Sequence, residues 1–139
     1  MKVRDVMTSD PITVTPHVTL GEVWDLMREA DIRHVPVTVN RVLVGMVSDR
    51  DLSSLDVARV LDTDGADALR RALGTSVVSA MSSDVISVEP EADLGDVVEL
   101  MIENKVGAIP VVLPDTREIV GIASYVDVLR AVHDLVTEE

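Results

Sequence analysis

Hydrophobic positions along the chain follow two spacings, one typical of helices and one typical of strands. Near residue 20 the apolar residues lie at i, i+3, i+4 and i+7, which places them on one helical face: Leu20, Val23, Trp24 and Met27. Thr19, with Glu22 three residues later, has the form of a capping box and predicts where this helix begins. Before it, residues 12–14 alternate apolar and polar positions, which predicts a short strand that Pro16 ends.

The segment after this helix predicts a β-hairpin and a second helix. Two Val-rich runs at residues 35–39 and 42–47 are joined by Asn40 and Arg41. Runs of this length and composition are typical of strands. A helical pattern then extends from Asp49 to about Leu61. The expected order of elements is therefore β-α-β-β-α, with a polar turn over residues 8–11 ahead of the first strand.

The same pattern occurs twice in the chain. Residues 3–37 and 77–111 align without a gap over 35 positions, of which 15 are identical. After a two-residue insertion, residues 44–51 match residues 120–127. The second copy predicts a strand at 86–88, a helix from Leu94 with Asp93 and Asp96 at its capping positions, a hairpin over 109–123 and a helix over 125–136. A repeat of this size predicts two similar halves related by a pseudo-twofold axis, with clefts between them as ligand sites.

We expect residues 1–139 to form a single domain of the α+β class. The first repeat covers about residues 2–61, a connecting insertion about 62–76 and the second repeat about 77–136. Within the insertion, Gly65 and Gly74 bracket a short helical stretch over residues 66–73. The two β-α-β-β-α repeats are expected to pack through their sheets.

The amino-acid composition limits which classes of function the chain can have. Apolar residues make up 47% of the chain, but Trp24 and Tyr125 are its only aromatic residues, so the core is expected to be aliphatic. The net charge of −13 argues against nucleic acids and anionic membranes as partners. The absence of cysteine excludes disulfides, and neither a signal peptide nor a membrane span is expected. These features predict a cytoplasmic protein.

Catalytic and metal-binding patterns are lacking in the sequence. The three histidines, His17, His34 and His133, have no metal-ligand spacing, and no nucleophile motif or glycine-rich phosphate loop occurs. Paired carboxylates are numerous only because acids are numerous. We therefore expect no enzymatic activity, no catalytic residues and no metal site.

One motif, Ser-x-x-Asp, recurs at the same place in both repeats. Ser48 and Asp51 form the first copy and Ser124 and Asp127 the second, each after an apolar strand and at the start of a helix. The motif is a common helix start, because both side chains accept free backbone N–H groups. Its repetition at strand ends also suits a ligand: a hydroxyl and a helix N-terminus can face an anion, and a carboxylate can accept both hydroxyls of a ribose. Both interpretations stay open.

A second candidate precedes the hairpin. Arg33 and His34 lie just before Val35 and Pro36, and the guanidinium group has the planar geometry that suits phosphate. A solvated loop is the alternative interpretation. In the second repeat the corresponding residues lack basic side chains: Gly107, Ala108, Ile109 and Pro110. The two halves are therefore not chemically equivalent.

With these motifs the chain resembles a cystathionine-β-synthase (CBS) domain pair, also called a Bateman module. The resemblance rests on the openings VMTSDPITV and AMSSDVISV, the strand entries RHVPV and GAIPV, and the closing segments GMVSDRDL and GIASYVDVL. It implies two β-α-β-β-α repeats that bind AMP, ADP, ATP or S-adenosylmethionine in clefts between the units. It also implies a homodimer formed through helices and a regulatory role toward an enzyme, transporter or channel, including sensing of cellular energy.

The resemblance assigns a role to each candidate residue. Asp51 and Asp127 would hold the ribose hydroxyls, with Ser48 and Ser124 beside the ribose and phosphate. The remaining apolar candidates would line the adenine slots or complete their walls: Ile12, Ile86, Val35, Pro36, Ile109 and Pro110.

Arg33 and His34 would meet the phosphates, with Arg50 as a further candidate. Because Gly107 and Ala108 replace the basic pair, the second cleft would take a less charged adenosine ligand, use Arg33 from across the axis, or stay empty.

Two functions remain for the chain as a whole. One is a ligand-sensing regulatory module with no obligatory cofactor, whose partners are an adenosine-containing small molecule and an unidentified enzyme or transporter. The other is a ligand-free module that dimerises and binds proteins. Thermal stabilisation by adenosine compounds would separate the two, because a ligand that binds only the folded chain raises its melting temperature.

Overall fold

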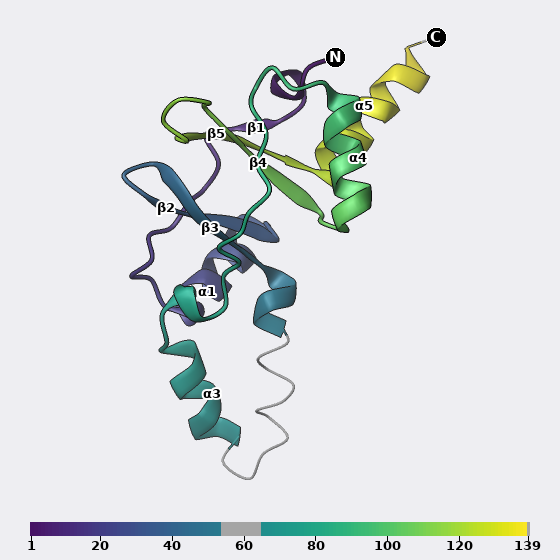
Figure 1. Cartoon of the computed structure of the whole chain (residues 1–139). Helices are drawn as coiled ribbons and strands as arrows, with labels where there is room; N and C mark the ends of the chain where they lie inside the picture. The colour runs from purple at the N-terminus through teal and green to yellow at the C-terminus, as the bar shows by residue number, and fades with distance from the viewer. Residues whose placement is uncertain (54–64, 139) are drawn as a thin grey trace. The chain divides into compact units, whose positions relative to one another are not determined.

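The computed structural model describes residues 1–53 and 65–138, and these form two compact units (Figure 1). Unit 1 consists of residues 1–11, 41–43 and 86–139, and unit 2 consists of residues 12–40 and 44–85. Each unit thus joins the opening segment of one sequence repeat to most of the other repeat. The sequence repeats, separated at residues 62–76, were defined by sequence similarity. The two units are defined by contacts in space and therefore have different boundaries.

Unit 2 contains helix α1 and most of the first hairpin, whose residues 41–43 belong to unit 1. Helix α1 (Leu20–Ala30) starts at the predicted capping box, in which Thr19 and Glu22 bond each other's backbone N–H groups, and it ends at Asp31 in the left-handed conformation. Strands β2 (His34–Val39) and β3 (Val42–Ser48) form a two-stranded sheet. Residues 49–53 are helical, and the rest of the helix expected up to Leu61 lies outside the described residues.

The connecting segment also contributes to unit 2. Helix α3 (Gly65–Leu73) confirms the helix expected over residues 66–73, and it contacts α1. A 3-10 turn, η2 (Val77–Ser79), follows it. Together these elements enclose an aliphatic core: Leu20, Val23, Met27, Val35, Val37, Val47, Leu52 and Val77.

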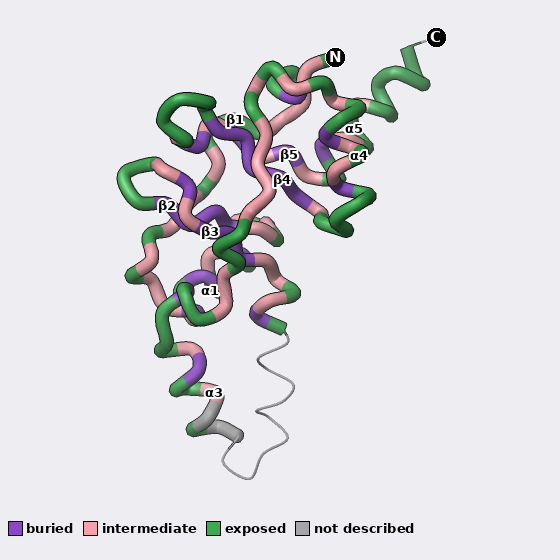
Figure 2. The backbone as a smooth tube through the Cα atoms, viewed as in Figure 1, coloured by how far each residue is buried: buried purple, intermediate pink, exposed green. Residues whose placement is uncertain are grey.

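Unit 1 is built around a three-stranded antiparallel sheet with strand order β1-β5-β4. The strands are β1 (Thr8–Ser9), β4 (Ala108–Val112) and β5 (Ile119–Ser124). Helix α4 (Leu94–Asn104) contacts β4, and helix α5 (Tyr125–Thr137) contacts β5. The chain enters through a 3-10 turn, η1 (Val3–Asp5). Its aliphatic core is Val3, Val97, Met101, Ile109, Val111 and Ala123. Figure 2 colours the backbone by burial, and β4 is buried along its whole length.

In each unit, the opening segment of one repeat packs against the helix and hairpin of the other repeat. In unit 1 the N–H of Val3 donates to Ala92 O (2.8 Å). In unit 2 the N–H of Val77 donates to Val18 O (2.9 Å). Both valines are fully buried, so each opening segment completes the core of the helix and hairpin it joins.

Several local predictions were wrong or only partly right. The expected turn at Thr8–Ser9 is a strand, because these residues pair with Ile122 and Gly121 of β5. The predicted strands at 12–14 and 86–88 reduce to single parallel bridges, Val14 with Val37 and Val88 with Val111. Asp93 precedes α4 but its side chain does not cap it.

Each opening segment places a methionine over a strand glycine. A Cβ atom on Gly121 would lie 2.3 Å from Met7 Sδ, and one on Gly45 would lie 2.5 Å from Met81 Sδ. Real Cβ atoms do not approach other atoms so closely, so an alanine at either position would require the methionine side chain to move. The fold is α+β as expected. No helix within residues 1–53 and 65–138 has the length and apolar character needed to cross a membrane.

Candidate functional site

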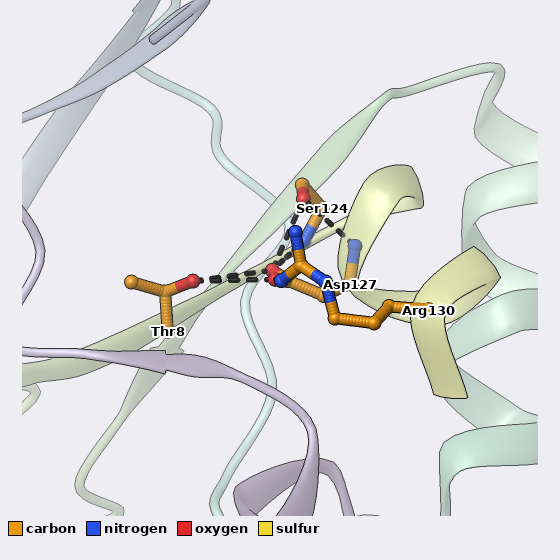
Figure 3. A network of polar contacts seen from close by, with 4 residues as sticks. All are labelled: Thr8, Ser124, Asp127 and Arg130. Carbon is orange, nitrogen blue, oxygen red and sulfur yellow. Dashed lines mark hydrogen bonds and ion pairs between the residues drawn. The ribbon is translucent and has the colours of Figure 1, made fainter. Parts of the chain in front are cut away.

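The carboxylate of Asp127 is the centre of a polar network in unit 1 (Figure 3). Its Oδ2 atom accepts hydrogen bonds from the N–H of Ser124 (2.9 Å) and from Ser124 Oγ (3.0 Å). Its Oδ1 atom accepts one from Thr8 Oγ1 (3.2 Å). Asp127 is only 7% exposed, although burial of an ionised carboxylate is costly unless it is hydrogen-bonded.

The local sequence explains why this carboxylate lies there. Strand β5 ends at Ser124 and α5 begins at the next residue, with the N–H of Asp127 donating to Ser124 Oγ (3.2 Å). A carboxylate is favourable in the first turn of a helix, where free N–H groups carry partial positive charge. Arg130, one helical turn later, places its Nη1 atom 3.8 Å from Asp127 Oδ1.

The first copy of the motif has the same geometry in unit 2. The N–H of Ser48 donates to Asp51 Oδ2 (2.8 Å), and the N–H of Asp51 donates to Ser48 Oγ (3.3 Å). Ser48 and Asp51 are both half-buried. The helix-cap interpretation is therefore confirmed for both copies of the motif. A carboxylate oxygen accepts more than one hydrogen bond, so a cap of this kind does not by itself prevent a ligand from binding.

A backbone hydrogen bond joins the start of each hairpin to the start of each closing helix. In unit 2 the N–H of Asp49 donates to Arg33 O (2.9 Å), and in unit 1 the N–H of Tyr125 donates to Gly107 O (2.9 Å). The predicted strand-entry residues and the Ser-x-x-Asp motif are therefore neighbours in each unit. The equivalent positions carry a charged pair, Arg33 and Asp49, in unit 2 but Gly107 and Tyr125 in unit 1.

The charges around Arg33 are largely compensated. Arg33 Nη1 lies 3.7 Å from Asp49 Oδ2, and both side chains are well exposed. Burial lowers the pKa of His34 below its usual value of 6.5, against the opposing effects of Asp49 and Asp51 and with a further lowering by Arg33. Since its pKa is lowered, His34 is mostly neutral at pH 7 and adds little positive charge there.

The other candidate residues differ in how far they are exposed. Ile12 is 44% exposed, Ile86 is half-buried and the Arg50 residue is exposed. Ala108 is buried, and four further candidates have no appreciable exposed surface: Val35, Pro36, Ile109 and Pro110. Val35 and Ile109 belong to the two aliphatic cores, and neither residue has exposed surface in the structure.

Sequence reasoning missed three residues of these networks. Thr8 was assigned to a turn, and only its pairing with β5 places it beside Asp127. Asp49 and Arg130 were also not predicted. Each lies within one helical turn of a motif aspartate in the sequence, and this short spacing could have identified them. Within the described part of the chain, no group of three or more histidine and acidic residues could hold a metal ion.

Several known proteins resemble this chain in sequence and in fold. The chain is 31% identical over 125 residues to the CBS domain-containing protein YhcV of Bacillus subtilis, covering 90% of this chain and 81% of that protein. The crystal structure of AcuB from Vibrio cholerae has a TM-score of 0.80 and 34% identity, covering 98% of this chain and 93% of AcuB. Some other curated relatives are longer, and the chain spans 40% and 23% of two of them.

CBSX2 of Arabidopsis thaliana, solved in complex with AMP, is also similar. In that complex the TM-score is 0.80 and the identity 28%, with 96% of this chain and 97% of the other covered. The CBS domain model matches residues 3–58 and 76–134, which together make up most of the chain. The protein therefore belongs to the CBS domain family and carries two copies of that domain.

Proposed function

We propose that the chain is a regulatory module that binds an adenosine-containing ligand, such as AMP, ADP, ATP or S-adenosylmethionine. The observation that carries this proposal is the repeated Ser-x-x-Asp motif, held in the same geometry at the ends of β3 and β5. In this proposal Asp51 and Asp127 accept hydrogen bonds from the ribose hydroxyls, with Ser48 and Ser124 beside them.

The network of Asp127 supports a role in binding hydroxyl groups. The alcohol group of Thr8 already donates to Asp127 Oδ1 at 3.2 Å. A carboxylate can accept about four hydrogen bonds in total, and Asp127 already accepts three, so capacity remains for one hydroxyl of a ribose. A buried carboxylate gains more from each added hydrogen bond than an exposed one, because water competes less.

The other ligand groups would contact residues around these motifs. Arg33, His34 and Arg50 would meet phosphate in unit 2, and Ile12 and Ile86 would contact adenine through their aliphatic side chains. The complex of CBSX2 with AMP supports adenosine monophosphate as one ligand of this type. Gly107 and Ala108 provide no cationic group in unit 1, so a ligand there would rely on Asp127, Thr8 and Arg130.

This function needs no catalytic step. A bound ligand would favour one arrangement of the protein only to the extent that it binds that arrangement more tightly than the other. The regulated enzyme or transporter would respond to that shift. Within this proposal the module needs no obligatory cofactor.

A thermal-shift series tests whether any adenosine compound binds. We expect adenosine, AMP, ADP, ATP or S-adenosylmethionine at about ten times its Kd to stabilise the fold by about 1.4 kcal/mol, which raises the melting temperature by about 3 °C or more. Guanosine and GMP at equal concentrations are the matched controls. An unchanged melting temperature with all five compounds at millimolar concentration would contradict the proposed function.

A second candidate function, dimerisation, is favoured by the exposed face of α5. Four apolar residues along this helix are between 47% and 69% exposed: Tyr125, Leu129, Val132 and Val136. Their i, i+4, i+7, i+11 spacing places them in one stripe on the helix. A second copy of the chain is the proposed occupant. The four residues of the stripe carry no charge, so two copies can meet there without direct repulsion although each molecule carries a charge of −13.

Sedimentation at about 50 μM tests this interface. We expect the parent chain to be a dimer and Leu129→Glu to be mainly monomeric, because a dimer would bury two unpaired carboxylates of this variant. Leu113→Glu, an exposed leucine outside the stripe, should leave the dimer intact. A monomeric parent chain would rule the dimer out.

A further inference from the structure

We propose that Asp49 determines which adenosine ligands unit 2 accepts, by holding Arg33 in an ion pair and disfavouring ligands with several negative charges. This inference rests on the proposed function and deepens it, since it concerns the charge of the ligand's 5′ group. Asp49 is not part of the Ser-x-x-Asp motif, and its role follows from its position beside Arg33.

Two contacts keep Asp49 beside Arg33. The backbone N–H of Asp49 donates to Arg33 O at 2.9 Å, which fixes the spacing of the two residues. Their side chains approach to 3.7 Å between Arg33 Nη1 and Asp49 Oδ2. A phosphate that binds Arg33 would therefore compete with a carboxylate tethered next to the guanidinium group.

The charged groups near Arg33 determine how strongly a phosphate would be attracted or repelled there. Arg33 contributes one positive charge, whereas Asp49 and Asp51 contribute two negative charges, and His34 is mostly neutral at pH 7 because burial lowers its pKa. With Arg50, which is exposed between the two aspartates, the formal charges of the cluster sum to about zero. A phosphate therefore gains little net attraction there, and removing the charge of Asp49 would make the cluster positive.

The ion pair between Arg33 and Asp49 has no charged counterpart at the equivalent positions in unit 1. The same backbone hydrogen bond joins Tyr125 to Gly107, and neither residue carries a charge at pH 7. The fold therefore does not require an ion pair at this junction. The pair between Arg33 and Asp49 is a property of unit 2, which is consistent with a role in ligand selection.

Titration of the parent chain and Asp49→Asn with adenosine, AMP and ATP by calorimetry tests this inference. We expect the variant to bind AMP about three to ten times more tightly than the parent chain and to gain more for ATP, with adenosine affinity unchanged within about twofold. The gain should shrink in 0.5 M salt, because both side chains are exposed. The gain should also vanish in Arg33→Ala/Asp49→Asn.

The matched control is Asp25→Asn, which removes the same charge from an exposed position on α1 of the same unit. An equal gain in this control, or a gain in Asp49→Asn that is the same for adenosine and ATP, would overturn the inference but leave the proposed function standing. If none of the three compounds binds the parent chain or the variant, this inference fails, and the proposed function fails as well only if ADP and S-adenosylmethionine also leave the melting temperature unchanged. Melting temperatures without ligand verify that each variant is folded.

Discussion

Replacing Asp51 with alanine is expected to weaken adenosine binding about tenfold to over a hundredfold. Hydrogen bonds to a charged group contribute about 1.5–3 kcal/mol each, and 1.4 kcal/mol corresponds to a factor of ten in affinity. Asp51 is the better target of the two motif aspartates because it is half-buried, whereas Asp127 is buried and bonded to Thr8. Calorimetric titration with adenosine measures the effect.

The control for this variant separates ligand binding from helix capping. Glu22 forms a similar capping box with Thr19 at the start of α1, in the same unit. Glu22→Ala should lose a comparable capping contribution, about 0.5–2 kcal/mol of stability, without any loss of affinity. If Asp51→Ala binds adenosine as tightly as the parent chain does, Asp51 is only a helix cap.

The role of Asp51 in contacting ribose has a second readout. The parent chain should prefer adenosine over 2′-deoxyadenosine and 3′-deoxyadenosine, because each analogue lacks one hydroxyl donor. Asp51→Ala should remove most of that preference in unit 2, since the acceptor is gone. A preference of unchanged size in the variant would place the ribose contact elsewhere.

Gly121→Ala is expected to destabilise the fold by about 1–3 kcal/mol, as overpacked cores do. The added Cβ would lie 2.3 Å from Met7 Sδ, 3.0 Å from its Cγ and 3.1 Å from its Cε. The Met7 side chain must therefore move away from Gly121 and lose part of its packing against the core of unit 1. Urea unfolding of the parent chain and the variant measures the change in the free energy of unfolding.

Two further variants show whether contact with Met7 is the cause. In Met7→Ala/Gly121→Ala the clash is absent, so the double variant should lose less stability than the sum of the two single variants. Gly95→Ala in α4 is the matched control, because nothing lies within 4 Å of the added Cβ, and it should stabilise the chain by about 0.4–1 kcal/mol. Additive losses in the double variant would show that Met7 and Gly121 act independently.

Much of the local structure was predictable from the sequence. Thr19 with Glu22 marked the start of α1, the spacing of apolar residues predicted α1 and α4, and α5 was predicted as the closing helix of the second repeat. The hairpins followed from Val-rich runs on either side of short polar turns. Such predictions succeed because helix and strand periodicity and capping depend on residues within a few positions of each other.

The candidate site was only partly predictable. Both Ser-x-x-Asp motifs were found because they repeat, and the structure places the strand-entry residues Arg33 and Gly107 beside them. Thr8 was missed because it is 119 residues from Asp127 and local rules place it in a turn. The ion pair between Arg33 and Asp49 was missed because it forms only when β2 and β3 pair. That pairing brings the residue before β2 next to the residue after β3.

The sequence by itself determined that the chain contains two copies of a helix-and-hairpin repeat, that its cores are aliphatic, and that the two halves differ in their basic residues. Only the tertiary structure decided which opening segment joins which hairpin. Val3 completes the core of the second repeat's hairpin and Val77 completes that of the first. The two openings are too alike in apolar pattern for local sequence to distinguish their partners, and that choice depends on long-range packing.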